Sequence, residues 1–164
     1  MGNERTQKTT LSFQEALISA GNKVIQFSGR SRRSEYWWTM AVVIVISFIL
    51  PSFLSFCLYL ATIPLTFRRL HDTGRSGWWW GVGAILQSLF IIWAVCDIFL
   101  EAMNMMSNDY NISSLSALIV KYWLLSLLII AYKIMLLVFL CMDSEPDENE
   151  YGESPKYVIT DDNI

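Results

Sequence analysis

The chain has little charge for its length. Only 16% of its 164 residues are Asp, Glu, Lys or Arg, whereas 54% are hydrophobic and the mean hydropathy is +0.38. Soluble domains carry roughly 25% charged residues. A water-soluble core of this size cannot hold so many apolar side chains. The shortage of charge therefore excludes an ordinary soluble domain and indicates a membrane protein.

Groups that hold metals, disulfides or nucleic acids are also scarce. The chain has one histidine and three cysteines. Cys57, Cys96 and Cys141 all lie inside apolar runs, with neither metal nor disulfide spacing. We interpret them as small apolar residues of helices and predict no cofactor and no zinc site. Basic residues form no extended face, which argues against a nucleic-acid partner.

A helix-initiation signal follows the polar N-terminus. Residues 1–11 are predicted to be disordered. Ser12 and Glu15 then read as a capping box, in which the hydroxyl and the carboxylate each bind a free amide of the first turn. Apolar residues recur at helical spacing as far as Phe27, and Gly29 ends the helix. This amphipathic helix is too polar to span, so we expect it either in the headgroup layer or against the protein's cytoplasmic face.

The first uncharged run, Thr39 to Phe67, is long for one span and short for two. One helix of this length would rise about 44 Å, against roughly 30 Å of hydrocarbon. Pro51 offers a break near the middle. A hairpin returns Arg68 to the side of Arg30, as the positive-inside rule requires. We therefore predict a short hairpin, and one kinked span is the alternative.

Two further apolar runs predict longer spans. The third begins at Trp78 and ends near Leu100, and the fourth runs from about Leu115 to Met142, with an outer loop over residues 101–114. The predicted fold is all-α, with four transmembrane helices in a single membrane domain over residues 12–142. Basic residues gather on the inner side, with Lys121 alone on the outer side. Both termini, including an acidic tail over residues 143–164, are then cytoplasmic.

Aromatic and charged residues mark the inner membrane–water boundary. Guanidinium groups stay with phosphate and water there, while aromatic rings sit at headgroup level. The interfacial aromatic residues are Tyr36, Trp37, Trp38, Trp78 and Trp79. The charged cluster consists of Arg30, Arg32, Arg33, Glu35, Arg68, Arg69, His71, Asp72 and Arg75.

Six arginines meet two acids in this cluster, which leaves two main interpretations. In the first, the cluster pins helix ends, and Glu35 and Asp72 each hold an arginine by charge-assisted hydrogen bonds. In the second, the surplus guanidinium groups bind anionic lipid headgroups or a phosphorylated ligand. Catalysis by His71 and Asp72 is disfavoured, because adjacent residues on a helix do not face one another.

Lys133 is predicted to lie near the bilayer midplane. If the fourth span ends near Met142, Lys133 lies about 15 Å from the inner surface, where a charged lysine costs a few kcal/mol or more. Either the ammonium group has a functional partner, or the span ends earlier and the side chain snorkels. A functional Lys133 would suit a small oligomeric transporter or channel subunit.

Two segments of the cluster resemble signatures of a known family. Phe27–Trp38 (FSGRSRRSEYWW) and Arg68–Trp79 (RRLHDTGRSGWW) resemble those of the domain of unknown function 805, small bacterial inner-membrane proteins. The closing residues Asn149, Tyr151, Gly152 and Pro155 resemble that family's final segment. The resemblance covers roughly residues 12–157. It implies membrane location and topology but no activity. The chain departs from the family in its short stretch between the signatures and its long outer loop and fourth span.

These patterns together predict a non-enzymatic, multi-pass protein of the bacterial inner membrane. We expect it to bind anionic lipid or a protein partner through the cytoplasmic arginine cluster. The alternative is the oligomeric transporter or channel subunit that uses Lys133.

Overall fold

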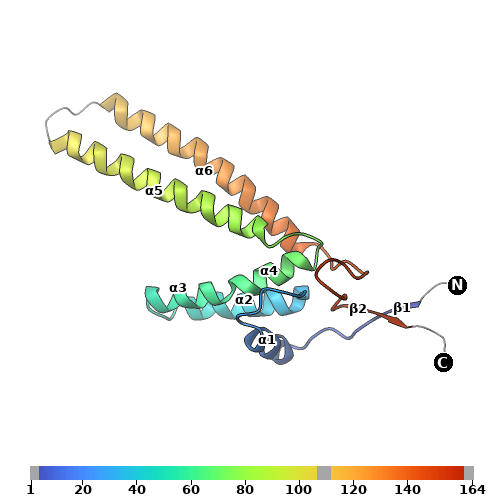
Figure 1. Ribbon diagram of the computed structural model, residues 1–164. Coiled ribbons are helices and arrows are strands. Elements are labelled where there is room, and N and C mark those ends of the chain that lie inside the picture. Colours follow the sequence, from blue (N-terminus) through green and yellow to red (C-terminus); the bar gives the residue numbers. More distant parts are fainter. Residues whose placement is uncertain (1–3, 107–111, 161–164) are drawn as a thin grey trace. The chain divides into compact units, whose positions relative to one another are not determined.

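The computed structural model of the protein describes residues 4–106 and 112–160 (Figure 1). In chain order the elements are β1 (Glu4–Gln7), α1 (Phe13–Asn22), α2 (Arg33–Ser47), α3 (Ser52–Ala61), α4 (Ile63–His71), α5 (Trp78–Met106), α6 (Ile112–Cys141) and β2 (Tyr157–Thr160). They divide into two compact units, Met1–Trp79 with Val138–Ile164, and Trp80–Leu137. Each unit is described by itself.

Three of the described helical segments are long and apolar enough to cross a bilayer. They are Ser52–His71, Trp78–Asn104 and Ile119–Cys141. The predicted class, a mostly helical membrane protein, is therefore confirmed. Helix α2 has only 15 residues, fewer than the roughly 20 that a span requires.

Helix α1 begins at the predicted capping box. The Ser12 amide donates to Glu15 Oε2 (2.8 Å), and the Glu15 amide donates to Ser12 Oγ (3.4 Å). The residues of α1 that are buried, Ala16 and Ala20, are small, and this lets the helix pack closely against α2.

The end of α1 differs from the prediction. The helix stops at Asn22, before the predicted continuation to Phe27. Gly21 and Asn22 favour helix poorly, and the β-branched pair Val24-Ile25 follows. Low local propensity therefore outweighs an apolar spacing that would have suited a longer helix.

Helices α2 and α3 form the predicted hairpin, with its break at Pro51. Helix α2 ends at Ser47 and α3 begins directly after Pro51, and the two helices pack together. The returning arm bends between α3 and α4 because Pro64 has no N–H for the carbonyl one turn back. The Thr62 hydroxyl donates to the Tyr59 carbonyl (2.7 Å) at this bend. The arm then continues through His71, and the turn that leads to α5 begins at Asp72.

Helices α5 and α6 form a second hairpin, whose arms meet through side chains. The Asp97 carboxylate accepts from Lys121 Nζ (2.5 Å) and from the Tyr122 hydroxyl (2.7 Å). The Lys121 ammonium also lies 3.8 Å from the centre of the Trp93 ring. Lys121, predicted as a lone outer-side cation, therefore has a carboxylate and an aromatic partner on α5.

The predicted outer loop over residues 101–114 is shorter than expected. Helix α5 continues to Met106 and α6 begins at Ile112. Residues 107–111, the remainder of the predicted loop, lie outside the described residues.

The two ends of the chain pair with each other. Strand β1 runs antiparallel to β2, with Glu4 opposite Thr160 and Gln7 opposite Tyr157 (Figure 1). This differs from the disorder predicted for residues 1–11. The partner strand lies at the other end of the sequence, and β1 itself (ERTQ) is polar, so nothing near residues 1–11 indicated the pairing.

Candidate functional site

The predicted charged cluster assembles where α2 begins and where α4 and α6 end. Arg30, Glu35, Arg68, Arg69 and Asp72 are all buried. A buried charge is costly unless it is paired and hydrogen-bonded. The partners of each charged group therefore decide what this site can do.

Asp72 is the centre of the network. Its carboxylate accepts from Arg30 Nε (3.0 Å), from Arg69 Nη1 (2.6 Å) and from the Ser144 hydroxyl. Its backbone carbonyl accepts from the Glu145 amide (2.9 Å). Burial raises the pKa of the Asp72 carboxyl, and the Ser144 hydrogen bond and the charges of Arg69 and Arg30 oppose that shift.

The terminal N–H groups of Arg30 bind the C-terminal tail. Its two terminal nitrogens donate to the backbone carbonyls of Asp147 (2.8 Å), Gly152 (3.2 Å) and Glu145 (2.5 Å). One guanidinium group thus ties the start of α2 to three points of the tail. A count of acidic side chains in the sequence does not include these acceptors. They are backbone carbonyl oxygens, which every residue carries whatever its side chain.

Two other arginines follow the same pattern. Arg69 Nε donates to the Leu140 carbonyl (3.0 Å). Arg32 donates to the carbonyls of Pro155 (2.5 Å) and Thr9 (2.6 Å), and so joins both chain ends to α2. The surplus of arginine over acid therefore does not leave these guanidinium groups free for an anion.

His71 contributes to the network through its ring and its carbonyl. The ring stacks on Tyr151, with 3.8 Å between centroids and 3° between planes. Nδ1 lies 3.1 Å from the Gly29 carbonyl, and the His71 carbonyl accepts from Asn149 Nδ2 (3.0 Å). The Asp72 carboxylate points to the arginines instead, so the two neighbours do not form a pair.

The tail is more closely packed than its acidic composition predicted. Ser144 and Ser154 are buried, and the Ser154 hydroxyl donates to the Glu145 carbonyl (3.0 Å). Gly74 adopts a positive φ of 67°, and a Cβ there would collide with the Glu145 carboxylate. The predicted tail over residues 143–164 is therefore, in its first part, a component of the arginine network.

The remaining charged residues lie at the edge of the network. Arg33 is exposed and lies 3.1 Å from Asp143, which also binds Lys156 Nζ (2.7 Å). The Arg75 guanidinium lies 4.1 Å from the centre of the Phe139 ring.

The predicted interfacial aromatic residues separate into two kinds. Trp37, Trp38, Trp78 and Trp79 are exposed, as headgroup contacts would be, but Tyr36 is buried. The Trp38 ring meets Phe13 of α1 edge to face, with 5.4 Å between centroids.

The ion pair of Glu35 and Arg68 is less complete than the Asp72 network. Arg68 Nη2 lies 3.6 Å from Glu35 Oε1, too far for a hydrogen bond. Arg68 Nη1 donates to the Lys23 carbonyl (2.9 Å). Within the described residues, Arg68 Nε and Nη2, Glu35 Oε1 and Ser31 Oγ are buried without a hydrogen-bond partner. Unlike Arg30 and Arg69, this arginine still has donors to offer.

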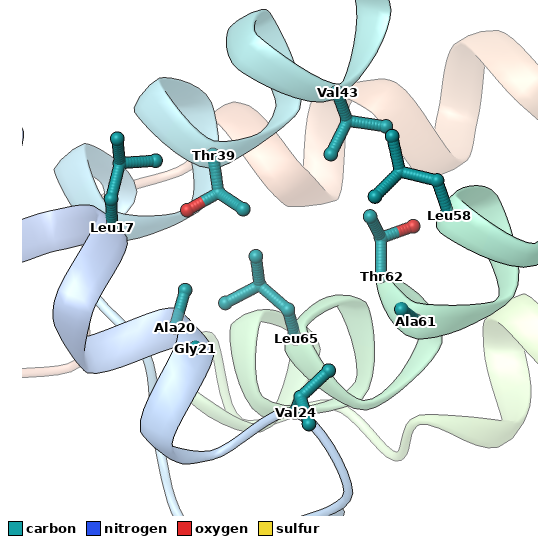
Figure 2. A pocket seen from close by; sticks show the side chains of 10 residues that line it. All are labelled: Leu17, Ala20, Gly21, Val24, Thr39, Val43, Leu58, Ala61, Thr62 and Leu65. Carbon is teal, nitrogen blue, oxygen red and sulfur yellow. The ribbon is translucent and has the colours of Figure 1, made fainter. Parts of the chain in front are cut away.

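An apolar cavity of about 160 Å³ lies one helical turn from this ion pair. Figure 2 shows side chains of α1, α2, α3 and α4 around it. Leu65 of the lining precedes Arg68 by three residues on α4, and Thr39 follows Glu35 by four on α2. Residues at these spacings share a helix face. Polar groups without hydrogen bonds and an apolar space thus lie about one helical turn apart on the same helices, an arrangement that suits an amphipathic ligand.

Lys133 lies outside both arrangements. It is exposed on α6, and no hydrogen bond or ion pair involves it in the part of the chain that the structure describes.

The helical spans and the arginine-centred network define an integral membrane protein. The chain belongs to the family described as "Protein of unknown function (DUF805)", which matches residues 49–153. The predicted family is thus confirmed.

Two relatives from Escherichia coli (strain K12) are named inner membrane proteins. Inner membrane protein YhaI is 31% identical over 155 residues, covering 85% of this chain and 94% of the relative. Inner membrane protein YhaH is 33% identical over 94 residues, covering 46% and 74%. No solved structure matches the chain. The family is one of inner-membrane proteins, and no activity is known from it.

The two acids should differ in their contribution to stability. Asp72→Asn leaves two buried guanidinium groups without their carboxylate, at an expected cost of about 3–5 kcal/mol. Glu35→Gln removes one long ion pair, at about 1–3 kcal/mol. Thermal unfolding in detergent should therefore show a larger fall in Tm for Asp72→Asn. Glu148→Gln, in the exposed part of the tail, is the matched control and should leave Tm unchanged. An equal or larger effect of Glu35→Gln would contradict this ranking.

Proposed function

We propose that this is a non-enzymatic inner-membrane protein that holds an anionic phospholipid on its cytoplasmic side. One acyl chain occupies the cavity between α1 and the first hairpin, and the phosphate lies beside Arg68 and Lys23. The observation that carries this proposal is the apolar cavity next to Arg68, whose Nε and Nη2 are buried without an acceptor.

The charges at the cavity favour an anion. Arg68 and Lys23 each contribute a positive charge, and Glu35 contributes one negative charge. Phosphate oxygens accept hydrogen bonds from guanidinium groups well. The cytoplasmic leaflet is rich in anionic lipid, and each basic residue near it gains about 1 kcal/mol. The core arginines Arg30 and Arg69 have no part in this binding, because the tail and Asp72 use their donors.

The topology that goes with this function has both termini and the arginine network in the cytoplasm. The first hairpin leaves from Arg33 and returns at His71, and Arg30 and Asp72 meet at its base. The second hairpin begins at Trp78 and ends at Cys141, and the chain on both sides of it belongs to the same compact unit as the network. In this topology each hairpin brings the chain back to the same basic surface, in agreement with the positive-inside rule.

Single cysteines test this topology. In a variant with Cys57, Cys96 and Cys141 replaced by alanine, Glu148→Cys should react with a membrane-impermeant maleimide only from the cytoplasmic side. Met106→Cys, which is exposed at the far end of α5, should react only from the outer side. Reaction of both from the same side would overturn the topology.

The lipid site is tested by filling its cavity and by removing its charge. A Cβ on Gly21 has nothing within 4 Å, so Gly21→Leu should fill the cavity and weaken binding of phosphatidylglycerol and phosphatidylcholine alike. Lys23→Gln should weaken only phosphatidylglycerol, by roughly fivefold, which corresponds to about 1 kcal/mol. Native mass spectrometry in detergent measures both affinities.

Two control variants keep that experiment specific. Ile18→Leu changes an exposed apolar residue of the same helix, and Lys8→Gln removes an exposed lysine elsewhere. Both should bind lipid as the unchanged protein does. Equal affinity of the unchanged protein for both lipids would remove the anion preference. Unchanged binding by Gly21→Leu would remove the cavity as the site.

Lys133 supports a second candidate function, that of an oligomeric transporter or channel subunit. An exposed lysine within a span needs a partner or a polar path, because lipid solvates its charge poorly. For this candidate, light scattering in detergent should find a defined oligomer that Lys133→Leu dissociates. A monomer of the unchanged protein would count against it.

A further inference from the structure

The tip of the first hairpin has no charged residue and exposes large apolar side chains. Phe48, Ile49 and Phe53 are 88%, 80% and 74% exposed. No charged residue occurs anywhere from Thr39 to Phe67. Three large apolar side chains at one exposed point would be unfavourable in water. Their surroundings are therefore apolar.

The outgoing arm is too short to bring this tip to the opposite headgroups. Ile49 follows Trp38, the last residue of the interfacial aromatic run, by eleven residues. As helix, that stretch rises about 17 Å, whereas the hydrocarbon layer is roughly 30 Å thick. The tip therefore ends about 13 Å short, and the longer returning arm cannot extend it, because both arms meet there.

Several backbone groups at the tip find partners within the hairpin. The Ser55 hydroxyl lies 3.1 Å from the carbonyl of Ser47, the last residue of α2, and 3.3 Å from the carbonyl of Leu50 in the turn. The Leu50 amide donates to the Ile46 carbonyl (3.0 Å), and Pro51 has no amide to satisfy. Internal partners of this kind are needed inside hydrocarbon, because no water is present there to bind backbone polar groups.

The second hairpin provides the contrast within the same chain. Its helices have 29 and 30 residues, enough for about 43–45 Å. Its far end carries Glu101 and Asn104, beyond the ion pair of Asp97 and Lys121. The second hairpin carries ionisable residues towards its far end, whereas the first hairpin carries them at its base only.

We infer that the first hairpin is re-entrant. It enters the hydrocarbon from the cytoplasmic side, turns within it and returns without reaching the outer surface. The chain then has two transmembrane helices, α5 and α6, instead of the four predicted from the sequence. The surface that α2 and α3 expose binds acyl chains of the cytoplasmic leaflet, so this unit of the protein is a one-leaflet insert held by the arginine network.

Cysteine accessibility at the tip tests the inference. In the background without native cysteines, Ile49→Cys should not react with impermeant maleimide from either side of intact membranes, and should react fully after denaturation. A nitroxide attached there should be accessible to oxygen and inaccessible to a water-soluble nickel chelate. Ser52→Cys, a near-isosteric change at an exposed position of the tip, should behave in the same way and serves if Ile49→Cys does not fold.

Both ways in which the inference can fail are visible in the same experiment. Reaction from the outer side would show that the hairpin crosses the membrane. Reaction from the cytoplasmic side would show that the tip lies in water. The side markers Glu148→Cys and Met106→Cys report the overall topology independently, so either result is distinct from a failure of the proposed topology. The lipid-binding measurements on the Gly21 and Lys23 variants do not depend on the labelling result at the tip either.

Discussion

The first unit depends on one constraint: a buried guanidinium group is costly for every donor that it brings out of water without an acceptor. The Asp72 carboxylate binds both Arg30 and Arg69. Its two oxygens cannot, however, accept hydrogen bonds from all the N–H groups of two guanidinium groups. The tail supplies the remaining acceptors as backbone carbonyls. Three segments far apart in the sequence are thereby tied to one point, since withdrawing any one of them would leave buried donors without partners. The hairpin, the turn after α4 and the tail hold their places for this reason.

The sequence predicted the features whose causes are local. The capping box at Ser12 and the break at Pro51 each depend on residues within one or two turns. The ion pairs that Glu35 and Asp72 each form with an arginine also followed from residue type, because few other acids lie near the arginines in the sequence. The tail contacts could not be predicted in this way. A carbonyl acceptor has no residue signature, so nothing in an acidic, proline-containing segment announces that it closes a network.

Arg68 shows that the hydrogen bonds of individual donor atoms describe the candidate site better than a count of charged residues does. By charge, the cluster has six cations and two acids, and each arginine is equally eligible to bind an anion. By atoms, the donors of Arg30 and Arg69 are occupied, whereas Arg68 keeps two nitrogens without hydrogen bonds. This arginine also lies three residues after Leu65, which lines the apolar cavity. Our proposed lipid site therefore uses one ion pair of the nine-residue cluster and the cavity lined by the same helices.

The two hairpins differ in length, and they therefore differ in where their turns and polar groups lie relative to the lipid. The second is long enough to place its polar residues, Asp97 and Lys121 among them, towards the far surface. The first stops before that surface, and so its turn must satisfy itself through Ser55 and Pro51. A short arm alone could have meant a distorted span. A short arm, a tip without charged side chains and a hydroxyl that binds two backbone carbonyls have one common explanation, which is a turn that lies inside hydrocarbon. The arginine network at the base is then the anchor that such an insert requires, because a hairpin without a far end can be held from only one side.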